Sequence, residues 1–486
     1  MSGPKKNGDN RDKYDLGLFH DFLFSAAKMT MTVAIPILPS LRLFHSSFAP
    51  HSNAKMTAQR GTKKLVIVRN DAPDADNIAA FMLLLQWAKN APDVELVIIF
   101  EPRPVDFSLA ILKPDDQKQL DRLLKRHFPE LGNPLKIRLN GLLTEQAISQ
   151  VTNLSEEDRA LLSMVVKPSK SSLEDSELHA SLMARDLARC LNELPGTSRS
   201  QAKVTILVDM DALSDTSPVN LKCHAQEQLF NRTPEEISEF YGFMNLPRLQ
   251  RQEEIRQWYK DRIKEADEKL QNSSIDVGCL DFRHLTERVK TAEGVTFIEG
   301  ASFNLLRRLV DEPGVAAKID CVVQAGTLDL AKNIFTNQFN IALDRESAAY
   351  VLDSSHLFRN FVAVPTHTSQ SISFSFDKLE KNGFSSLARW ILCFNRGEDP
   401  LKVAKGNVTL AGQRRDATIK LPDLAMILLT FDFEAYPRET SKVEVQVVQG
   451  ESLLFVQSES GILAFLPKDG HIYKTVDLVA LLTSVH

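Results

Sequence analysis

Three carboxylates in one short turn are the residues of this chain best placed to do chemistry. Asp71, Asp74 and Asp76 closely follow the apolar run 65–68, which has the length and β-branched content of a buried strand. An apolar helix over 78–88 and a strand over 94–100 come next, an order typical of a parallel sheet with crossover helices. Ligands bind such sheets at the carboxyl ends of the strands, so the acidic turn lies where a site is expected.

The remaining apolar runs extend the same pattern. Strands are predicted at 204–209, 295–298, 319–323 and 361–364, helices at 303–310, 344–352 and 421–431, and alternating strands at 443–448 and 453–456. The predicted fold class is therefore α/β, a mainly parallel sheet flanked by helices, with an antiparallel finish or sheet edge. The segment 232–271 is highly charged with sparse apolar residues, which predicts a long solvated helix or insertion. A partner-binding helix is the alternative there.

Five motifs in the second half of the chain follow one another with consistent spacing. They are Gly300-Ala-Ser-Phe-Asn304, Val322-Val-Gln-Ala-Gly326, Lys332-Asn333, Asn337-Gln-Phe-Asn-Ile341 and Asp344-Arg-Glu-Ser-Ala-Ala349. Together they resemble the inosine/uridine-preferring nucleoside hydrolase family, in which a glycine turn, a Gly-Asn step and a Phe-Asn-Ile core recur in this order. The turn 69–76, Asp423 and the tail 476–482 lie where that family has its acidic motif, its late Asp and its closing helix.

The resemblance covers about 64–100 and 290–486. It implies a nucleoside-hydrolase-like domain over 61–486, nucleoside-hydrolase-like in fold, with a large helical insertion within about 110–285. It also implies hydrolysis of the N-glycosidic bond of purine or pyrimidine nucleosides, and hence a nucleoside or other ribose-containing small molecule as partner. The implied cofactor is Ca²⁺, which prefers several oxygen ligands. A homo-oligomer is left open.

Site residues follow from the resemblance position by position. The metal positions are Asp76, Glu299 (through its backbone carbonyl) and Asp423, and the ribose positions are Asn333, Asn340 and Gln338. We expect Asp76, Asn333, Asn340 and Asp423 to meet at the strand ends.

Four positions depart from the family pattern. Arg69 stands in place of the first Asp, the general base, and Ala75 in place of the penultimate Asp; Gln338 replaces a ribose-binding Glu, and Pro422 replaces a His. Because Arg69 is a cation, we expect it to occupy the place of the metal and to pair with Asp76 or Asp423. Asp71 and Asp74 are the acids that would take over catalysis if the turn shifted.

Two interpretations of function remain open from these residues. One is an N-ribohydrolase with an altered or weakened metal site, and the other is a pseudoenzyme that keeps the fold for ligand sensing or protein interaction. Simpler structural roles are also open. Asn333 and Asn340 would cap turns, Asp423 would be the N-cap of its helix, and the acidic turn would be solvated.

Composition excludes several classes of function. Lys and Arg number 58 against 63 Asp and Glu, a net charge of −5, which argues against nucleic acid as the partner. Five scattered cysteines without a CxxC motif argue against structural zinc and are typical of reduced thiols in an intracellular protein. No run of about 18 apolar residues predicts a membrane span.

The first sixty residues differ from the rest. Residues 1–60 are predicted to be a disordered extension, and the expected localisation is cytoplasmic. Between residues 22 and 70 there is no acidic residue, and the stretch 40–48 is basic and rich in serine, the composition of a mitochondrial transit peptide. A mitochondrial localisation is the alternative if translation starts at Met29 or Met31.

Overall fold

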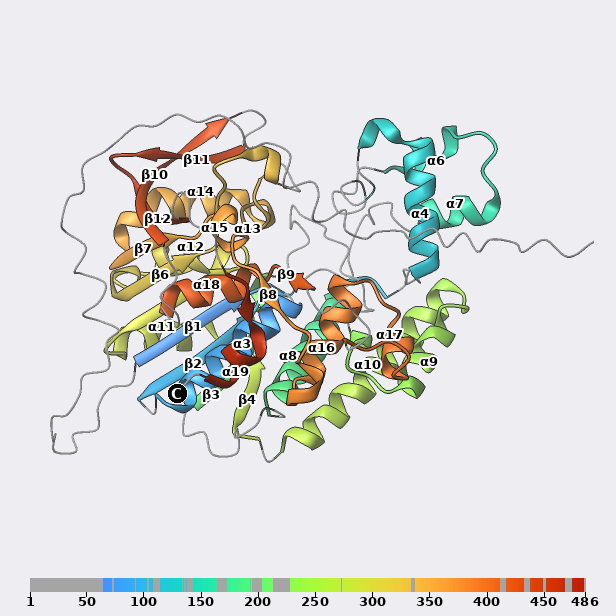
Figure 1. Ribbon diagram of the computed structural model, residues 1–486, viewed down its shortest axis with the longest axis horizontal. Helices are drawn as coiled ribbons and strands as arrows, with labels where there is room; N and C mark the ends of the chain where they lie inside the picture. Colours follow the sequence, from blue (N-terminus) through green and yellow to red (C-terminus); the bar gives the residue numbers. More distant parts are fainter. Residues whose placement is uncertain are drawn as a thin grey trace, which may run out of the picture. The chain divides into compact units, whose positions relative to one another are not determined.

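The computed structural model describes most of the chain after residue 63 (Figure 1). The described residues are 64–71, 74–91, 93–102, 105–107, 114–132, 134, 137, 143–163, 173–192, 194, 203–212, 228–271, 273–333, 337–410, 417–431, 438–448, 452–467 and 474–484. The predicted disordered extension 1–60 lies outside them. Within these ranges, no helix combines the length and the apolar character that a membrane span requires.

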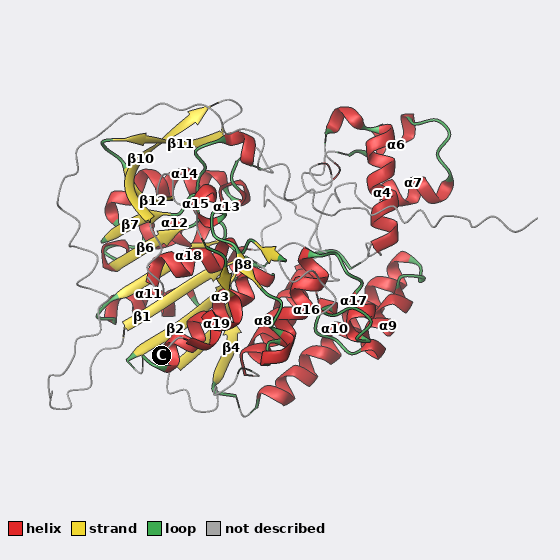
Figure 2. Ribbon diagram, viewed as in Figure 1, coloured by secondary structure: helices red, strands yellow, loops and turns green. Residues whose placement is uncertain are grey.

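A ten-stranded sheet forms the centre of the fold (Figure 2). Its strands are β1 (Lys64–Asn70), β2 (Val94–Phe100), β3 (Lys203–Val208), β4 (Ile275–Cys279), β5 (Val295–Gly300), β6 (Ile319–Val323), β7 (Asn360–Ala363), β10 (Arg438–Val448), β11 (Ser452–Ser458) and β12 (Ile462–Pro467). They lie in the order β11-β10-β12-β7-β6-β5-β1-β2-β3-β4. Neighbours from β12 to β4 are parallel, and β10 is antiparallel to β11 and β12. The predicted parallel sheet with an antiparallel edge is confirmed.

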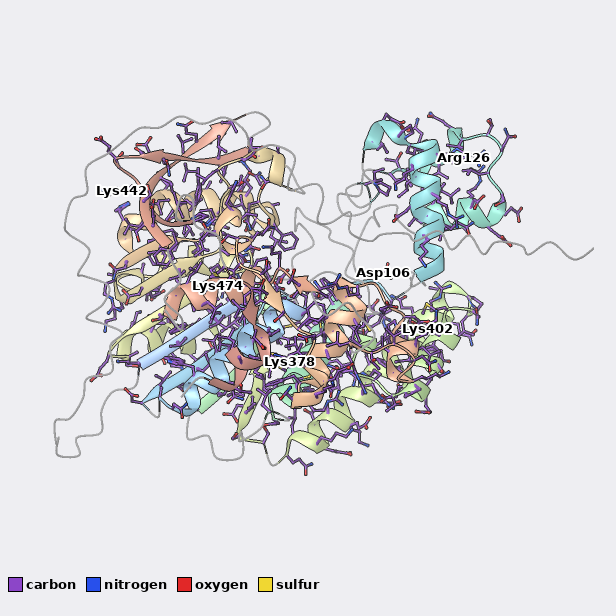
Figure 3. The ribbon with its side chains drawn as sticks, in the orientation of Figure 1. Asp106, Arg126, Lys378, Lys402, Lys442 and Lys474 are labelled. Carbon is purple, nitrogen blue, oxygen red and sulfur yellow. The ribbon has the colours of Figure 1, made fainter. Side chains whose placement is uncertain are left out.

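The antiparallel edge shows the alternation that its sequence predicts. On β10, Lys442 is exposed and Val443 is fully buried, so one face of this strand meets solvent and the other meets the core (Figure 3). β1 is different, because every residue after Lys64 is buried. A strand covered on both faces must lie inside the sheet, and β1 indeed pairs with β2 on one side and β5 on the other.

Helices cover both faces of the sheet. One core joins Leu65 and Ile67 of β1 to residues of α11 (Phe282–Thr291), α12 (Asn304–Asp311) and α14 (Arg345–Asp353). On the opposite face, Phe81 of α3 (Ala75–Lys89) packs edge-on against Phe100 of β2, with ring centroids 5.9 Å apart. Two further helices pack on α3, namely α18 (Pro422–Phe431) and α19 (Leu478–Ser484).

The predicted insertion contributes both helices and sheet. Its helices are α4 (Pro114–His127), α6 (Glu145–Gln150), α7 (Glu156–Ser163), α8 (Leu173–Asn192), α9 (Pro234–Phe243) and α10 (Arg248–Leu270). The first three share a small core of their own that includes Leu120, Leu124, Ile148 and Leu162. β3 and β4 also fall within 110–285, so part of this segment belongs to the central sheet.

Helix α10 corrects the expectation of a solvated helix. Ile255, Trp258 and Tyr259 are at most 3% exposed and join a core with Phe107 and Phe240. A few large side chains on one face bury enough apolar area to hold a helix whose other positions are charged, so a low count of apolar residues does not imply a solvated helix.

The remaining elements are short. They are α13 (Phe339–Leu343), α15 (Thr366–Ser369), α16 (Ser385–Trp390) with a π-helical turn over Ile391–Asn395, and α17 (Pro400–Ala404). A second sheet has the order β13-β8-β9, from β8 (Phe374–Ser375), β9 (Thr418–Ile419) and β13 (Val476–Asp477). The predicted closing helix over 476–482 therefore begins as strand β13 and becomes helical only from Leu478.

Candidate functional site

Acidic side chains gather where β1 ends and where α3 and α18 begin. Asp71 follows the last residue of β1, Asp74 is the N-cap of α3, Asp76 lies in its first turn, and Asp423 lies in the first turn of α18. Asp71 is 5% exposed and Asp423 is 7% exposed, while Asp74 and Asp76 are half-buried. We call these four residues the acid site. Its members come from both ends of the described chain.

Hydrogen bonds fix the geometry of the acid site. The backbone N–H of Asp423 donates to Oδ2 of Asp76 at 3.3 Å. Oδ1 of Asp74 accepts from the backbone N–H of Asp76 at 3.1 Å and of Asn77 at 3.2 Å, the usual arrangement of an N-cap. The side chain of Asn77 donates to Oδ1 of Asp71 at 3.1 Å. Asp74 therefore caps the helix that carries Asp76 and Asn77. Asp76 contacts Asp423, and Asn77 contacts Asp71.

Burial and mutual repulsion favour the protonated forms of Asp74 and Asp76. Burial, followed by the charges of Asp423 and Asp71, raises the pKa of Asp76 to about 7. Burial and the charges of Asp76 and Asp71 raise the pKa of Asp74 well above its usual range. At neutral pH Asp76, with its pKa of about 7, is therefore present in both its protonated and its ionised form, as general acid–base chemistry needs.

An amide and a glycine complete the site. Asn70 is 1% exposed and donates from Nδ2 to Oδ1 of Asn77, while its own Oδ1 has no hydrogen-bond partner among the described residues. A Cβ built on Gly300 would lie 2.8 Å from Oδ1 of Asn70 and 3.0 Å from Oδ1 of Asp423. Only a glycine leaves these two oxygens in place, so the end of β5 forms one wall of the acid site.

Calcium does not fit the arrangement seen here. Carboxylate and amide oxygens are the donors that Ca²⁺ prefers. Nevertheless, in the part of the chain that the structure describes, no three His, Cys, Asp or Glu side chains are grouped so that they could hold a metal ion. Of the expected calcium positions, Asp76 and Asp423 are joined by a hydrogen bond, and the backbone carbonyl of Glu299 accepts from the N–H of Gln324, so the metal site stays a prediction.

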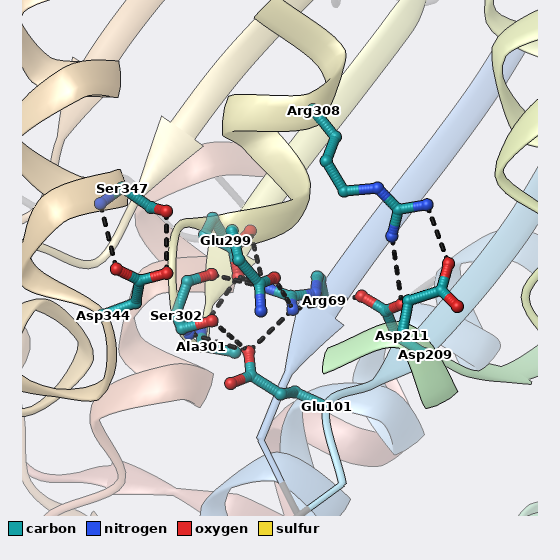
Figure 4. Close-up of polar contacts among 11 residues, drawn as sticks. Arg69, Glu101, Asp209, Asp211, Glu299, Ala301, Ser302, Arg308, Asp344 and Ser347 are labelled. Atoms are coloured by element: carbon teal, nitrogen blue, oxygen red, sulfur yellow. Dashed lines mark hydrogen bonds and ion pairs between the residues drawn. The ribbon is translucent and has the colours of Figure 1, made fainter. Parts of the chain in front are cut away.

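The structure corrects the expectation for Arg69. Its side chain is fully buried and forms ion pairs with Glu101 at 2.7 Å, Asp209 at 3.2 Å and Glu299 at 3.3 Å (Figure 4), rather than with Asp76 or Asp423. The reason is that successive side chains of a strand point to opposite faces. Asn70 faces α3 and the acid site, so Arg69 faces α12, on the other side of the sheet.

Glu299 lies with Arg69 and not with the acid site. It pairs in register with Arg69 across β1 and β5, and its backbone carbonyl accepts from the N–H of Gln324 at 2.8 Å. Burial raises the pKa of Glu299 to about 8, even though the charge of Arg69 opposes this shift. The same balance of burial against Arg69 raises the pKa of Glu101.

Two of the expected ribose-binding residues are engaged within the protein. Oε1 of Gln338 accepts from the N–H of Asn340 at 3.1 Å and of Ile341 at 3.3 Å, so Gln338 is the N-cap of α13. Nδ2 of Asn340 donates to the backbone oxygen of Gln324 at 3.0 Å, just beyond the end of β6. Asn340 thus lies at the same edge of the sheet as the acid site, without a hydrogen bond to it.

Asn333 is placed differently from the other two. It follows the short helical turn Leu330–Lys332, and its backbone N–H bonds to the carbonyl of Leu330. Its Nδ2 is buried without a hydrogen-bond partner among the described residues.

Sequence reasoning missed Asn70, Asn77, Glu101 and Asp209. Continuing the strand alternation for two residues beyond the apolar run 65–68 would have placed Arg69 and Asn70 on opposite faces of the sheet. Asn77 lies one residue beyond the acidic turn. Glu101 and Asp209 each follow a strand end directly, a position that could have been read from the sequence.

Comparisons with known proteins return similarity to solved structures only. No model of a protein family matches the chain, and no curated protein matches it. The chain is similar to an inosine-uridine preferring nucleoside hydrolase from Bacillus anthracis, with 14% identity, a TM-score of 0.40, and coverage of 87% of this chain and 98% of the other. A plant nucleoside hydrolase gives the same four values.

A purine-preferring ribonucleoside hydrolase from Gardnerella vaginalis is also similar, with 9% identity, a TM-score of 0.38, and coverage of 87% and 99%. TM-scores of 0.40 and below are too low to carry a family or an activity over to this chain. The α/β architecture is established by the strand order and register described above.

Proposed function

We propose that the protein is a nucleoside N-ribohydrolase that cleaves the N-glycosidic bond at the acid site. The observation that carries this proposal is the meeting of Asp71, Asp76 and Asp423 at one edge of the sheet without Arg69 beside them. The interpretation as an inactive site rests on four departures, Arg69, Ala75, Gln338 and Pro422, of which only Arg69 would neutralise these acids. Since Arg69 faces the other side of the sheet, its ion pairs are with Glu101, Asp209 and Glu299, and it does not neutralise these carboxyl groups.

Hydrolysis of a glycosidic bond needs one carboxyl group to donate a proton and a second to activate water. Asp76 has a pKa of about 7 and is thus partly protonated at neutral pH, which suits a general acid. Asp71 accepts a hydrogen bond from Asn77, which fixes its orientation and suits a general base. We assign Asp74 a structural role, because its Oδ1 accepts two backbone hydrogen bonds that cap α3.

The substrate class comes from the motif resemblance. It favours a nucleoside or another ribosyl compound, and the net charge of −5 is in keeping with a small molecule rather than a nucleic acid. The nucleobase is not assigned by any contact described above.

A pseudoenzyme that binds a ribosyl ligand without turnover is the second candidate. One observation favours it. The side chain of Gln338 accepts a hydrogen bond within α13, and the side chain of Asn340 donates one to Gln324. A ligand would have to displace these bonds, or bind without them, and imperfect positioning lowers the rate more than the affinity.

The deciding experiment measures release of free base from inosine and uridine, with and without a chelator, for the full chain. Asp76→Asn and Asp71→Asn are expected to lower the rate by about 100-fold or more, the usual contribution of an acid or base. Asp281→Asn is the matched control, because Asp281 is an exposed N-cap on α11.

Calorimetry with the same nucleosides separates the two candidates. Binding without release of base would identify the pseudoenzyme, and absence of both binding and release would contradict both proposals.

A further inference from the structure

A second cluster of charged side chains lies on the face of the sheet opposite to the acid site. Arg69, Glu101, Asp209 and Glu299 come from the ends of β1, β2, β3 and β5, which are consecutive neighbours in the sheet. We call these four residues the Arg69 layer. Their side chains are at most 12% exposed. The charges of the three acids outweigh the effect of burial and raise the pKa of Arg69 further, so it remains a cation.

The Arg69 layer forms hydrogen bonds with the turn that follows β5. Nη1 of Arg69 donates to the backbone oxygen of Ser302, and Nη2 donates to Oδ1 of Asn304, the first residue of α12. Glu299 accepts from the N–H of Ala301 at 3.0 Å. Glu101 accepts from the N–H of Ser302 at 3.0 Å and from its hydroxyl at 2.6 Å (Figure 4). Every residue from 301 to 304 except Phe303 is thus bonded to this layer.

The same turn begins with Gly300, the wall of the acid site. Gly300 lies close to both Asn70 and Asp423, because a Cβ at this position would lie 2.8 Å from Oδ1 of Asn70 and 3.0 Å from Oδ1 of Asp423. A displacement of the 300–304 turn would therefore be transmitted directly to the side chain of Asp423.

We infer that Arg69 is a positioning residue, which holds the 300–304 turn so that Gly300 seats Asn70 and Asp423 in the acid site. This inference rests on the proposed function for its catalytic consequence, but its structural part stands independently. A planar guanidinium suits the role, because its fork bonds the turn and the three acids at once. A lysine has no such fork.

The test compares four variants of the full chain. Arg69→Gln removes the centre of the layer. Ser302→Ala removes the hydroxyl bond from the turn to Glu101, and Asn304→Ala removes the side-chain bond between the turn and Arg69. These two variants decide the question if Arg69→Gln fails to fold. Arg308→Gln is the matched control, because Arg308 pairs with Asp209 at 3.5 Å and Asp211 at 2.9 Å, and among the described residues its side chain forms no hydrogen bond to the turn.

The first readout is amide hydrogen exchange, which does not depend on activity. The three network variants should exchange faster in residues 300–304 and also in 422–426, and Arg308→Gln should do neither. The second readout is nucleoside hydrolysis. We expect kcat to fall by about 10- to 100-fold with KM changed less than about twofold, because the acids are displaced by a fraction of an ångström.

Two results would overturn the inference. One is faster exchange confined to 300–304 with kcat unchanged, which would leave Arg69 a purely structural residue. The other is the same change in 422–426 for Arg308→Gln, which would indicate general loosening. If the unmodified chain hydrolyses no nucleoside, the proposed function fails, and hydrogen exchange alone still decides whether Arg69 positions Asp423.

Discussion

The backbone amide of Asp423 donates a hydrogen bond to the carboxylate of Asp76, although 347 positions separate the two residues in the chain. This contact joins the first turns of α18 and α3, two helices that pack on each other over one face of the sheet. It places the carboxyl group of Asp423 close enough to raise the pKa of Asp76.

Replacing Asp76 by Asn should stabilise the protein at alkaline pH. Because the pKa of Asp76 is raised from 3.8 to about 7, the folded state binds the proton more tightly than the unfolded state. Stability contributed by this group is present below pH 3.8 and is lost as the pH rises toward about 7. Asp76→Asn removes that loss, so its gain over the unmodified chain should grow between pH 4 and pH 7 in urea denaturation.

Asp281→Asn serves as control for this comparison, since its exposed side chain caps α11. A gain for Asp76→Asn that stays constant across the pH range would show that the carboxyl group is not perturbed.

The rate of hydrolysis should fall as the pH rises through about 7. Asp76 acts as general acid only while protonated, and its pKa of about 7 places the loss of that proton in this range. The measurement is kcat/KM for inosine from pH 5 to pH 9. An activity that instead increases across this interval would exclude Asp76 as the proton donor and point to it as the base.

Gly300→Ala should reduce activity while the fold is retained. The added methyl group would lie 2.8 Å from Oδ1 of Asn70 and 3.0 Å from Oδ1 of Asp423, so both must move. Overpacking of this kind costs about 1–3 kcal/mol. Gly294→Ala, just before the other end of β5, is the control, because nothing lies within 4 Å of its Cβ position. Equal activity of the two variants would mean that Gly300 does not shape the site.

Calcium should have little effect on the protein. No three acidic, His or Cys side chains of the described residues are grouped for a metal ion. We therefore expect no heat of Ca²⁺ binding in calorimetry at millimolar concentration and no loss of hydrolysis with a chelator. Tight binding that disappears in Asp423→Asn would reveal that Asp76 and Asp423 rearrange around a cation, and would restore the metal site that the motifs imply.

Trp258→Ala should destabilise the chain by about 3–5 kcal/mol, as expected for a buried aromatic residue. Trp258 is 3% exposed and packs against Phe240 with ring centroids 5.0 Å apart. Gln257→Ala, at the exposed neighbouring position, should change the free energy of unfolding by less than about 0.5 kcal/mol. Similarly small changes in the free energy of unfolding for both variants would favour the alternative interpretation of α10 as a partner-binding helix.

The strand and helix order could be predicted from sequence because long apolar runs are strong local signals. Runs such as those of β1, β2 and α3 bury almost every side chain, and they appeared where expected. The end of β1 could not be predicted from the apolar run alone. Arg69 and Asn70 look like turn residues, yet they continue the strand, and that continuation decides which face each side chain occupies.

The ribose-binding candidates illustrate a different limit. Matching a motif identifies a residue type at a position, but not what the side chain bonds to. Gln338 caps α13 through the geometry of the following two amides, and Asn340 bonds to Gln324 because β6 ends beside it. Both arrangements depend on the path of the backbone, which residue spacing does not determine.

The position of β1 between β2 and β5 also has a consequence for synthesis on the ribosome. β2 follows β1 within 30 residues, whereas β5 begins only at Val295. During translation of the intervening segment, the nascent chain exposes one hydrogen-bonding edge of β1, a hazard for aggregation. The contact of Asp76 with Asp423 likewise forms only after α18, near the end of the described chain, has been synthesised. Chaperone dependence should therefore be greatest for ribosome-bound chains that stop before residue 295.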